Sequence, residues 1–323
     1  MIHWFKKLLA VGAVALVAAC GGSDDPVPPG TLAQEATSRG FSALVAAADK
    51  AGLVPALSAA SSNLTVFAPT DSAFTALATT LGFPSATAMV TALDGPTLAK
   101  ILQYHVLPAR RSAADLVAGG ATQPTLYVFE GAASTLALNT TTGVRITDEV
   151  LTQASVSTAD VPASNGVIHV IDKVLVPPGV LNLVQMAKLN PSFSVLVEAV
   201  GAAGLAGTLS STVPFTVFAP NNNAFTAALA ELNLTKAQLL ASPDLAGILT
   251  YHAVAGNVRA ANVMALPKPA QVTTVQGAAF TVSTTLQITD ARARTANLAA
   301  TDVIASNGVI HVIDKVILPP LPN

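Results

Sequence analysis

The chain has almost no cysteine or tryptophan. Its only cysteine is Cys20 and its only tryptophan is Trp4, so both stand within the first twenty residues. A lone cysteine excludes a disulfide within one chain, and stability must therefore come from a buried core. Aromatic residues make up only 5% of the chain. We therefore expect few of the flat aromatic surfaces on which sugars stack.

Charged residues of either sign are also scarce. Asp, Glu, Lys and Arg together make up 11% of the chain, and the formal net charge is −2. Without a basic excess, nucleic acids and anionic lipid surfaces are poor partners. Beyond the first twenty residues, no uncharged apolar run reaches the roughly 18 residues that a membrane-spanning helix needs, and Glu198 interrupts the best candidate.

The first thirty residues have the pattern of a targeting signal and a tether. Lys6 and Lys7 precede an apolar stretch, 8–19, that is too short to cross a bilayer as a helix. The small residues before Cys20 resemble the lipobox of bacterial lipoproteins, where the signal is cleaved before a cysteine that then carries lipid. We predict a signal peptide at 1–19, lipid attachment at Cys20 and a lipid-attached tether at 20–30. The alternative is an ordinary signal peptide with an incidental thiol.

This prediction also bears on charge and location. Without residues 1–19 the count of Lys and Arg falls from 16 to 14 while Asp and Glu stay at 18, so the formal charge becomes −4. The Pro- and Gly-rich stretch 21–30 would reach about 35 Å when extended. We expect a lipid-anchored protein of the cell envelope. Because Gly21 is not acidic, the outer membrane or cell surface is favoured over the inner membrane.

The chain repeats itself over long segments. The nineteen residues 160–178 return as 302–320 with sixteen identical positions. Two shorter segments are repeated in the same order: 65–74 recurs as 216–225, and Tyr104-His105 recurs as Tyr251-His252. The copies are separated by 142, 151 and 147 residues, far more than the roughly 20–50 residues of a solenoid repeat. We predict two consecutive domains, at 31–178 and 179–323.

Each repeated unit starts with helical patterns and ends with strand patterns. Apolar residues spaced i, i+3, i+4 and i+7 predict amphipathic helices at 41–48 and 193–200. The Asn-Gly pairs at 165–166 and 307–308 predict hairpin turns before central strands, and the Tyr-His pairs are predicted to open strand-like stretches. The fold class is therefore predicted to be α+β.

The repeated motifs resemble a known family. Thr-Val-Phe-Ala-Pro-x-x-x-Ala-Phe, the Tyr-His pair and Asn-Gly-Val-Ile-His-Val-Ile-Asp-Lys-Val occur twice in this order, and together they resemble the fasciclin (FAS1) domain over about residues 31–320. The resemblance implies two β-wedge domains with helices packed at one side, in a secreted or membrane-anchored protein that mediates adhesion. One departure is Asn222, which stands where the first unit has Asp71. This argues against Asp71 as an acid or metal ligand that both units need.

The resemblance also supplies the candidate site. In some animal fasciclin domains a Tyr-His pair with aliphatic flanks is implicated in integrin binding. The matching residues here are Tyr104, His105, Tyr251 and His252, and they are our candidate partner-binding residues. The alternative is core packing, with each tyrosine making one buried hydrogen bond.

No catalytic or metal site is predicted. The histidines at 105, 169, 252 and 311 match between the units, but no His-Glu-x-x-His, Cys-x-x-Cys or Gly-x-Ser-x-Gly pattern accompanies them. His169 shares a strand face with Val167 and Ile171, which predicts a neutral, hydrogen-bonded imidazole in the core. A hydrolase would need His105 or His169 in a pocket beside a serine or carboxylate. We therefore expect no enzyme activity, cofactor or metal.

The combined prediction is a lipoprotein that works by surface contact. Its partner would be an unidentified protein or matrix or polysaccharide ligand, and it would reach the membrane only through lipid on Cys20. Two modest sites joined by the linker 177–179 would bind by avidity. The alternative is a carbohydrate- or small-ligand-binding protein of the envelope.

Overall fold

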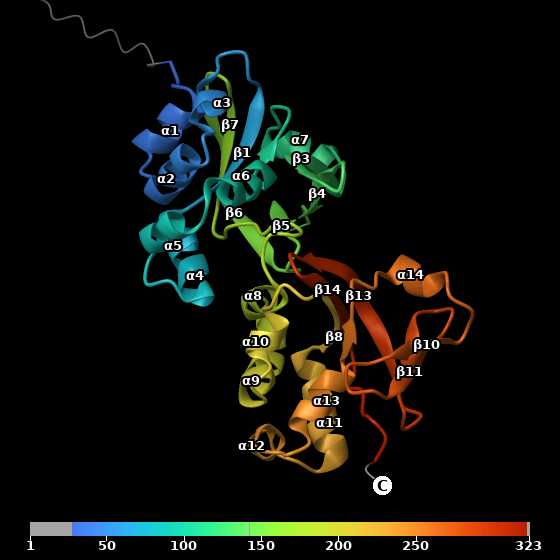
Figure 1. The fold of residues 1–323 in the computed structure, drawn as a ribbon. Coiled ribbons are helices and arrows are strands. Elements are labelled where there is room, and N and C mark those ends of the chain that lie inside the picture. Colours follow the sequence, from blue (N-terminus) through green and yellow to red (C-terminus); the bar gives the residue numbers. More distant parts are fainter. Residues whose placement is uncertain (1–27, 142, 322–323) are drawn as a thin grey trace, which may run out of the picture.

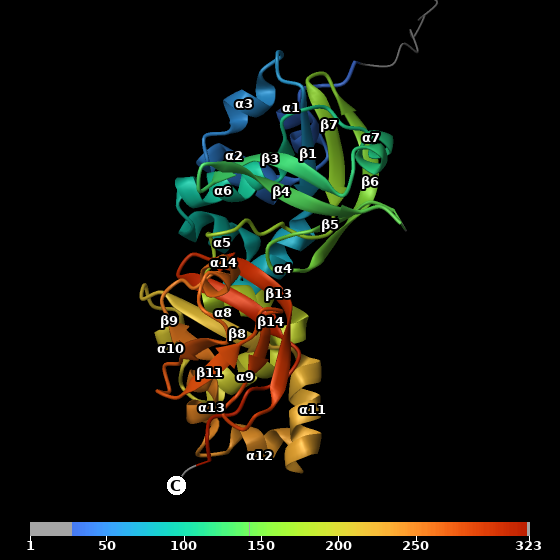
Figure 2. The same ribbon diagram turned by 90° about the vertical axis from the view of Figure 1, so that its right-hand side faces the viewer.

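The computed structural model describes residues 28–141 and 143–321, and it shows two domains in tandem (Figures 1 and 2). Residues 1–19, Cys20 and most of the predicted tether lie outside the described residues. In each domain helices pack with a seven-stranded mixed sheet, so the predicted α+β class is confirmed.

The elements of the first domain follow the predicted order. Its helices are α1 (Leu32–Ser38), α2 (Ser42–Lys50), α3 (Val54–Ser58), α4 (Asp71–Leu81), α5 (Ala86–Ala92), α6 (Gly95–Tyr104) and α7 (Ala113–Ala118). Its strands are β1 (Leu64–Pro69), β2 (Val106–Leu107), β3 (Thr122–Phe129), β4 (Ala132–Asn139), β5 (Arg145–Thr147), β6 (Gln153–Ala163) and β7 (Gly166–Ile171).

The second domain repeats this series. Its helices are α8 (Leu183–Leu189), the short 3-10 helix η1 (Pro191–Phe193), α9 (Ser194–Ala202), α10 (Ala206–Leu209), α11 (Asn222–Leu232), α12 (Lys236–Leu240), α13 (Leu245–Tyr251) and α14 (Ala260–Met264). Its strands are β8 (Phe215–Pro220), β9 (Ala253–Ala255), β10 (Ala270–Thr273), β11 (Ala279–Val282), β12 (Gln287–Thr289), β13 (Thr295–Ala305) and β14 (Gly308–Ile313).

The two sheets have the same topology. The strand order is β2-β1-β7-β6-β5-β4-β3 in the first and β10-β11-β12-β13-β14-β8-β9 in the second. The first and last long strands of each domain pair in parallel, β1 with β7 and β8 with β14, and the other pairs are antiparallel. These central strands are buried on both faces, which explains their continuous β-branched sequence. Helices α1, α2, α4 and α5 cover one side of β1 and β7 (Figure 1).

The glycines after the repeated asparagines are required by a close approach between strands. The β6–β7 turn consists of Ser164 and Asn165, and Gly166 already begins β7. A Cβ atom at Gly166 would lie 2.3 Å from the carbonyl oxygen of Leu64, and one at Gly308 would lie 2.0 Å from that of Phe215. The predicted hairpins are confirmed, but the glycine is kept for the contact with β1 or β8 and does not form the turn.

The domains meet in a packed junction. The linker residues Pro177 and Pro178 are buried, and the backbone N–H of Gly179 donates to the carbonyl oxygen of Ile304 at 2.9 Å. Val150 and Val176 of the first domain belong to the same hydrophobic cluster as the helices of the second. The linker therefore holds the domains together and does not act as a free spacer.

Among the described residues, no single helix is long and apolar enough to cross a membrane. The bent pair α4 and α5 meets the criteria of length and composition when taken together.

Candidate functional site

The candidate Tyr-His pairs end helices and do not open strands. Tyr104 is the last residue of α6 and His105 caps that helix, so β2 begins only at Val106. The Nδ1 atom of His105 lies 2.7 Å from the carbonyl oxygen of Ile101, one turn back, so the side chain extends the helical hydrogen-bond pattern. The predicted strand-like start at Tyr104 is therefore wrong by two residues.

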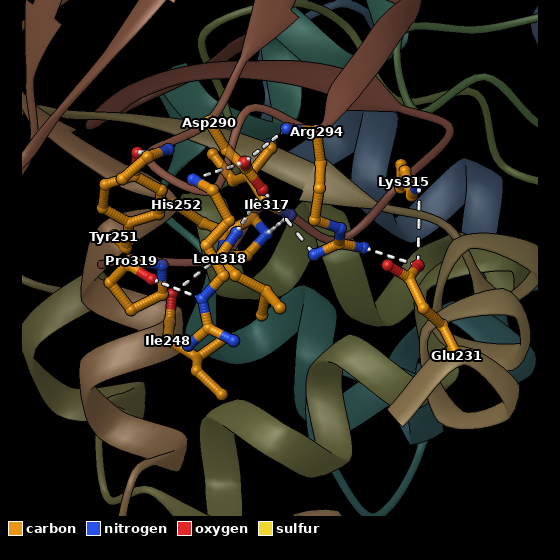
Figure 3. A network of polar contacts seen from close by, with 12 residues as sticks. Glu231, Ile248, Tyr251, His252, Asp290, Arg294, Lys315, Ile317, Leu318 and Pro319 are labelled. Atoms are coloured by element: carbon orange, nitrogen blue, oxygen red, sulfur yellow. Dashed lines mark hydrogen bonds and ion pairs between the residues drawn. The ribbon is translucent and has the colours of Figure 1, made fainter. Parts of the chain in front are cut away.

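Each histidine of these pairs links its helix to the end of its domain. The backbone N–H of Leu175 donates to Nε2 of His105 at 2.9 Å, so this ring carries its proton on Nδ1 and donates it to Ile101. In the second domain Nδ1 of His252 lies 2.8 Å from the carbonyl oxygen of Ile248, and Nε2 accepts from Ile317 at 3.1 Å (Figure 3). Both rings have both nitrogens satisfied.

All four candidate residues are buried. Their exposed fractions are 2% for Tyr104, 1% for His105, 0% for Tyr251 and 1% for His252. The hydroxyl of Tyr251 donates to the carbonyl oxygen of Ala279 at 3.0 Å. Burial raises the pKa of Tyr104 and lowers the pKa of His105 and of His252 to about 4. This geometry supports the core-packing alternative and leaves these side chains almost no surface for direct contact with a partner.

The other two histidines hold a bulge in the sheet. Nε2 of His169 lies 2.9 Å from the carbonyl oxygen of Arg111, and the backbone N–H of Asp160 donates to Nδ1 at 3.3 Å. Asp160 has a φ of 57°, where the β6–β7 register shifts. His311 and Asp302 repeat this arrangement. The predicted hydrogen-bonded core histidine is therefore found in both domains.

Sequence reasoning missed a pair of buried carboxylates at matching positions. Asp148 accepts hydrogen bonds from the backbone N–H groups of Thr152 and Val176, and its carboxylate pairs with Lys173. Asp290 accepts from the backbone of Arg294 and Leu318 (Figure 3). Each aspartate thus ties a turn to the final segment of its domain, and the spacing of 142 residues could have identified the pair.

The cation beside the buried carboxylate differs between the domains. In the second domain Nη1 of Arg294 lies 3.6 Å from Asp290, while Nη2 lies 2.9 Å from Glu231 (Figure 3). Lys315, the counterpart of Lys173, pairs with Glu231 instead. The conserved feature is therefore a neutralised buried carboxylate, and the residue that neutralises it is interchangeable. This points to a structural role.

Each domain also contains an apolar cavity beside its first two helices. The volumes are about 220 Å³ in the first domain and about 300 Å³ in the second. Every residue that lines the second cavity, except Gly201, has a counterpart lining the first. The pairs include Leu32 and Leu183, Ala36 and Ala187, Val45 and Val197, Leu57 and Leu209, and Ile168 and Ile310. No sequence pattern signals these cavities, because a void depends on how helices pack and leaves no motif.

The described residues show no cluster of metal-binding type. Within 28–141 and 143–321, no group of three or more His, Cys, Asp or Glu side chains is placed to hold a metal ion. The two histidines named for a hydrolase, His105 and His169, both bond to backbone groups.

Comparison with known proteins identifies the family. A model of the Fasciclin domain matches two segments of the chain, residues 39–177 and 191–319. The chain belongs to the fasciclin domain family. The two matched segments correspond to the two domains of the fold, so the resemblance read from the sequence is confirmed.

Relatives match about one fasciclin domain of this chain. Protein sll1483 of Synechocystis sp. is 44% identical over 144 residues, which is 44% of this chain and 75% of that protein. Immunogenic protein MPB70 of Mycobacterium bovis is 35% identical over 143 residues, covering 42% of this chain and 67% of that protein. Transforming growth factor-beta-induced protein ig-h3 of Sus scrofa is 34% identical over 157 residues, covering 48% of this chain and 22% of that protein.

A solved structure is also similar. The FAS1 domain pair from the insect cell adhesion molecule fasciclin I is 18% identical, with a TM-score of 0.45, and the match covers 88% of this chain and 98% of that one.

Proposed function

We propose that the protein is a lipid-anchored component of the cell envelope that acts, without catalysis, as an adhesion or interaction module through its two fasciclin domains. Fasciclin domains are linked with adhesion or interaction in homologous proteins. The observation that carries the proposal is the packed junction. Because the linker is buried and bonded to Ile304, the two domains present their outer surfaces in one fixed arrangement.

A fixed arrangement changes how avidity works. A flexible linker lets two sites find targets at many separations, whereas a rigid pair binds best to targets that match its own spacing. Two modest sites at a constant separation favour a partner with repeated or extended surface, such as a polymeric matrix or a neighbouring protein array. The unidentified protein, matrix or polysaccharide ligand predicted from the sequence fits this description.

The surface that could make such contacts lies outside the Tyr-His pairs. Val117 on α7 and Met264 on α14 are 55% and 46% exposed, and the 147-residue offset of the Tyr-His pairs relates them. Each domain thus exposes a large apolar side chain at the same place. We expect Val117→Lys and Met264→Lys to weaken capture of the target from intact envelope or matrix, and the double variant to abolish it.

Matched controls separate surface contact from core packing. Tyr104→Phe and Tyr251→Phe remove only buried hydroxyl groups, so they should leave capture unchanged. Capture that persists in the double lysine variant and falls in the phenylalanine variants would reverse the assignment and return the contact role to the Tyr-His pairs.

The anchoring part of the proposal has its own test. The variant Cys20→Ser should leave the protein unlabelled by radioactive palmitate and release it from membranes into the soluble fraction. Val150→Ala, a core change far from the N-terminus, controls for loss of folding. Unchanged membrane association in Cys20→Ser would remove the lipid anchor from the proposal.

The carbohydrate alternative has little support in the described surface. The aromatic side chains of residues 28–141 and 143–321 are buried or partly buried, and the tyrosines are all buried. A sugar-stacking platform would need such a side chain at the surface.

A further inference from the structure

Both domains contain an apolar cavity at the same place, although some of the lining residues differ. Ala48 in the first domain is replaced by Val200 in the second, and Val54 is replaced by Ala206. The larger side chain on α9 is thus offset by a smaller side chain on α10. Voids of this kind normally destabilise a core, and here one is found at the same place in both domains.

The chemistry of the cavity walls selects an apolar ligand. Aliphatic side chains from α1, α2, α3, β1 and β7 line the first cavity, and their counterparts line the second. Apolar cavities stay dry, and an apolar void of about 150 Å³ is large enough to take up benzene. The second cavity, at about 300 Å³, would by that ratio hold roughly twelve carbon atoms.

Among the positions that line both cavities, one differs in polarity. Thr37 lines the first cavity, and Lys188 takes its place in the second. Lys188 is exposed, and among the described residues no ion pair or side-chain hydrogen bond involves its ammonium group. The nearest acid along α9 is Glu198, next to the lining residue Val197, and its carboxylate is paired with Lys236. The second cavity therefore combines an apolar interior with an unpaired cation at its rim.

We propose that the cavity of the second domain binds a medium-length straight-chain carboxylic acid, with the alkyl chain among the aliphatic side chains and the carboxylate beside Lys188. Charge complementarity sets this class apart from neutral apolar ligands. The first cavity, which has Thr37 at the same position, takes neutral chains and has no preference for the acid.

Titration of the mature two-domain chain with decanoate and with decanol tests the proposal. At low ionic strength decanoate should bind with saturation and roughly two- to fivefold more tightly than decanol, the range of an exposed ion pair. Octanoate should bind about fifteenfold more weakly than decanoate, because each of the two missing methylenes contributes about fourfold. Raising the salt concentration should reduce the difference between decanoate and decanol.

Three variants locate the site. Lys188→Thr copies the first domain and should reduce decanoate affinity to that of decanol. Ala187→Leu fills the second cavity and should abolish tight decanoate binding. Ala36→Leu makes the same change at the matching position of the first cavity and should leave that binding intact. Thermal unfolding of each variant confirms that it is folded.

Each result decides the proposal. Saturable decanoate binding that Ala187→Leu removes and Ala36→Leu spares, with the preference over decanol lost in Lys188→Thr, supports it. The proposal is overturned by an absence of saturable binding, by unchanged decanoate affinity in Ala187→Leu, or by a preference for decanoate that survives in Lys188→Thr.

Discussion

Glu149 of the first domain accepts a hydrogen bond from the backbone N–H of Ile304 in the second, with 2.6 Å between the carboxylate oxygen and the nitrogen. Burial raises the pKa of Glu149 to about 7. The hydrogen bond from Ile304 and the charge of Arg259 lower this pKa, and the charges of Asp148 and Asp302 raise it. The second domain has Ala291 at the matching position, so this contact belongs to the junction and not to the repeated fold.

Glu149 should make the stability of the domain pair depend on pH. Its pKa is higher in the folded chain than in the unfolded chain, so the folded state binds more protons between about pH 4.5 and 7. Stability from this group is therefore present at low pH and lost as the pH rises through 7, by roughly 3 kcal/mol at most. Urea unfolding at pH 5 and pH 8 should show that wild type loses stability relative to Glu149→Gln, which keeps an acceptor for Ile304 and has the same buried histidines.

A control for this prediction lies at the same junction. Glu130 pairs with Arg259 across the domains, but its side chain is 54% exposed. Glu130→Gln should therefore leave the pH dependence unchanged. An identical slope in wild type and Glu149→Gln would show that Glu149 is not protonated in the folded pair.

The buried histidines should act in the opposite direction. Burial lowers the pKa of His105 and of His252 to about 4, so the unfolded chain binds more protons between about pH 6.5 and 4. Their contribution is complete above pH 6.5 and is lost as the pH falls to 4. His252→Gln should lose about 1–3 kcal/mol at pH 7, because Ile317 loses its acceptor. It should also flatten the acid limb of the stability curve, and a limb as steep as in wild type would contradict this explanation.

Much of the fold could be predicted because the sequence contains two copies of the same unit, and a pattern found in both copies is more reliable than one found once. The hairpin before β7 and the helix at 41–48 follow from local patterns, and they recur in the second domain. The end of α6 was predicted wrongly because Tyr104, Val106 and Leu107 together suggest a strand. The side chain of His105 bonds to Ile101 and carries the helix one residue further, which no local propensity records.

The site was less predictable for a physical reason. A repeated Tyr-His pair is compatible with a binding surface and with a packed core, and only the burial of its side chains distinguishes these two roles. The environment of Glu149 and the cavities depend on contacts between segments that are far apart in the chain. Glu149 also has no acidic counterpart in the second domain, so the repeat does not point to it. Patterns of residue type along the chain do not encode such distances.

Gly308 should tolerate no side chain. A Cβ atom there would lie 2.0 Å from the carbonyl oxygen of Phe215, so Gly308→Ala must push β14 away from β8. We expect a loss of about 3 kcal/mol or more in the free energy of unfolding. Gly201→Ala is the matched control, because its Cβ would meet nothing within 4 Å inside helix α9. It should gain about 0.5–1 kcal/mol. Equal effects of the two substitutions would show that β8 and β14 can separate freely.

Asp290→Asn should be among the most damaging single changes in the second domain. The carboxylate accepts from three backbone N–H groups, those of Arg292, Arg294 and Leu318, and it is the buried counter-charge for the Arg294 guanidinium. An amide offers one acceptor oxygen in place of two, points N–H groups at N–H donors and leaves that guanidinium without its buried partner. Breaking such a pair costs about 3–5 kcal/mol.

The matched control for Asp290→Asn is Asp314→Asn. The carboxylate of Asp314 is exposed and accepts from the backbone and side chain of Asn297. Its loss should cost about 1 kcal/mol or less, because water replaces the missing acceptor. Chemical denaturation of both variants at pH 7 measures the difference. If the two variants unfold at the same urea concentration, Asp290 does not neutralise Arg294 in solution, and Arg294 must be paired with the exposed Glu231 alone.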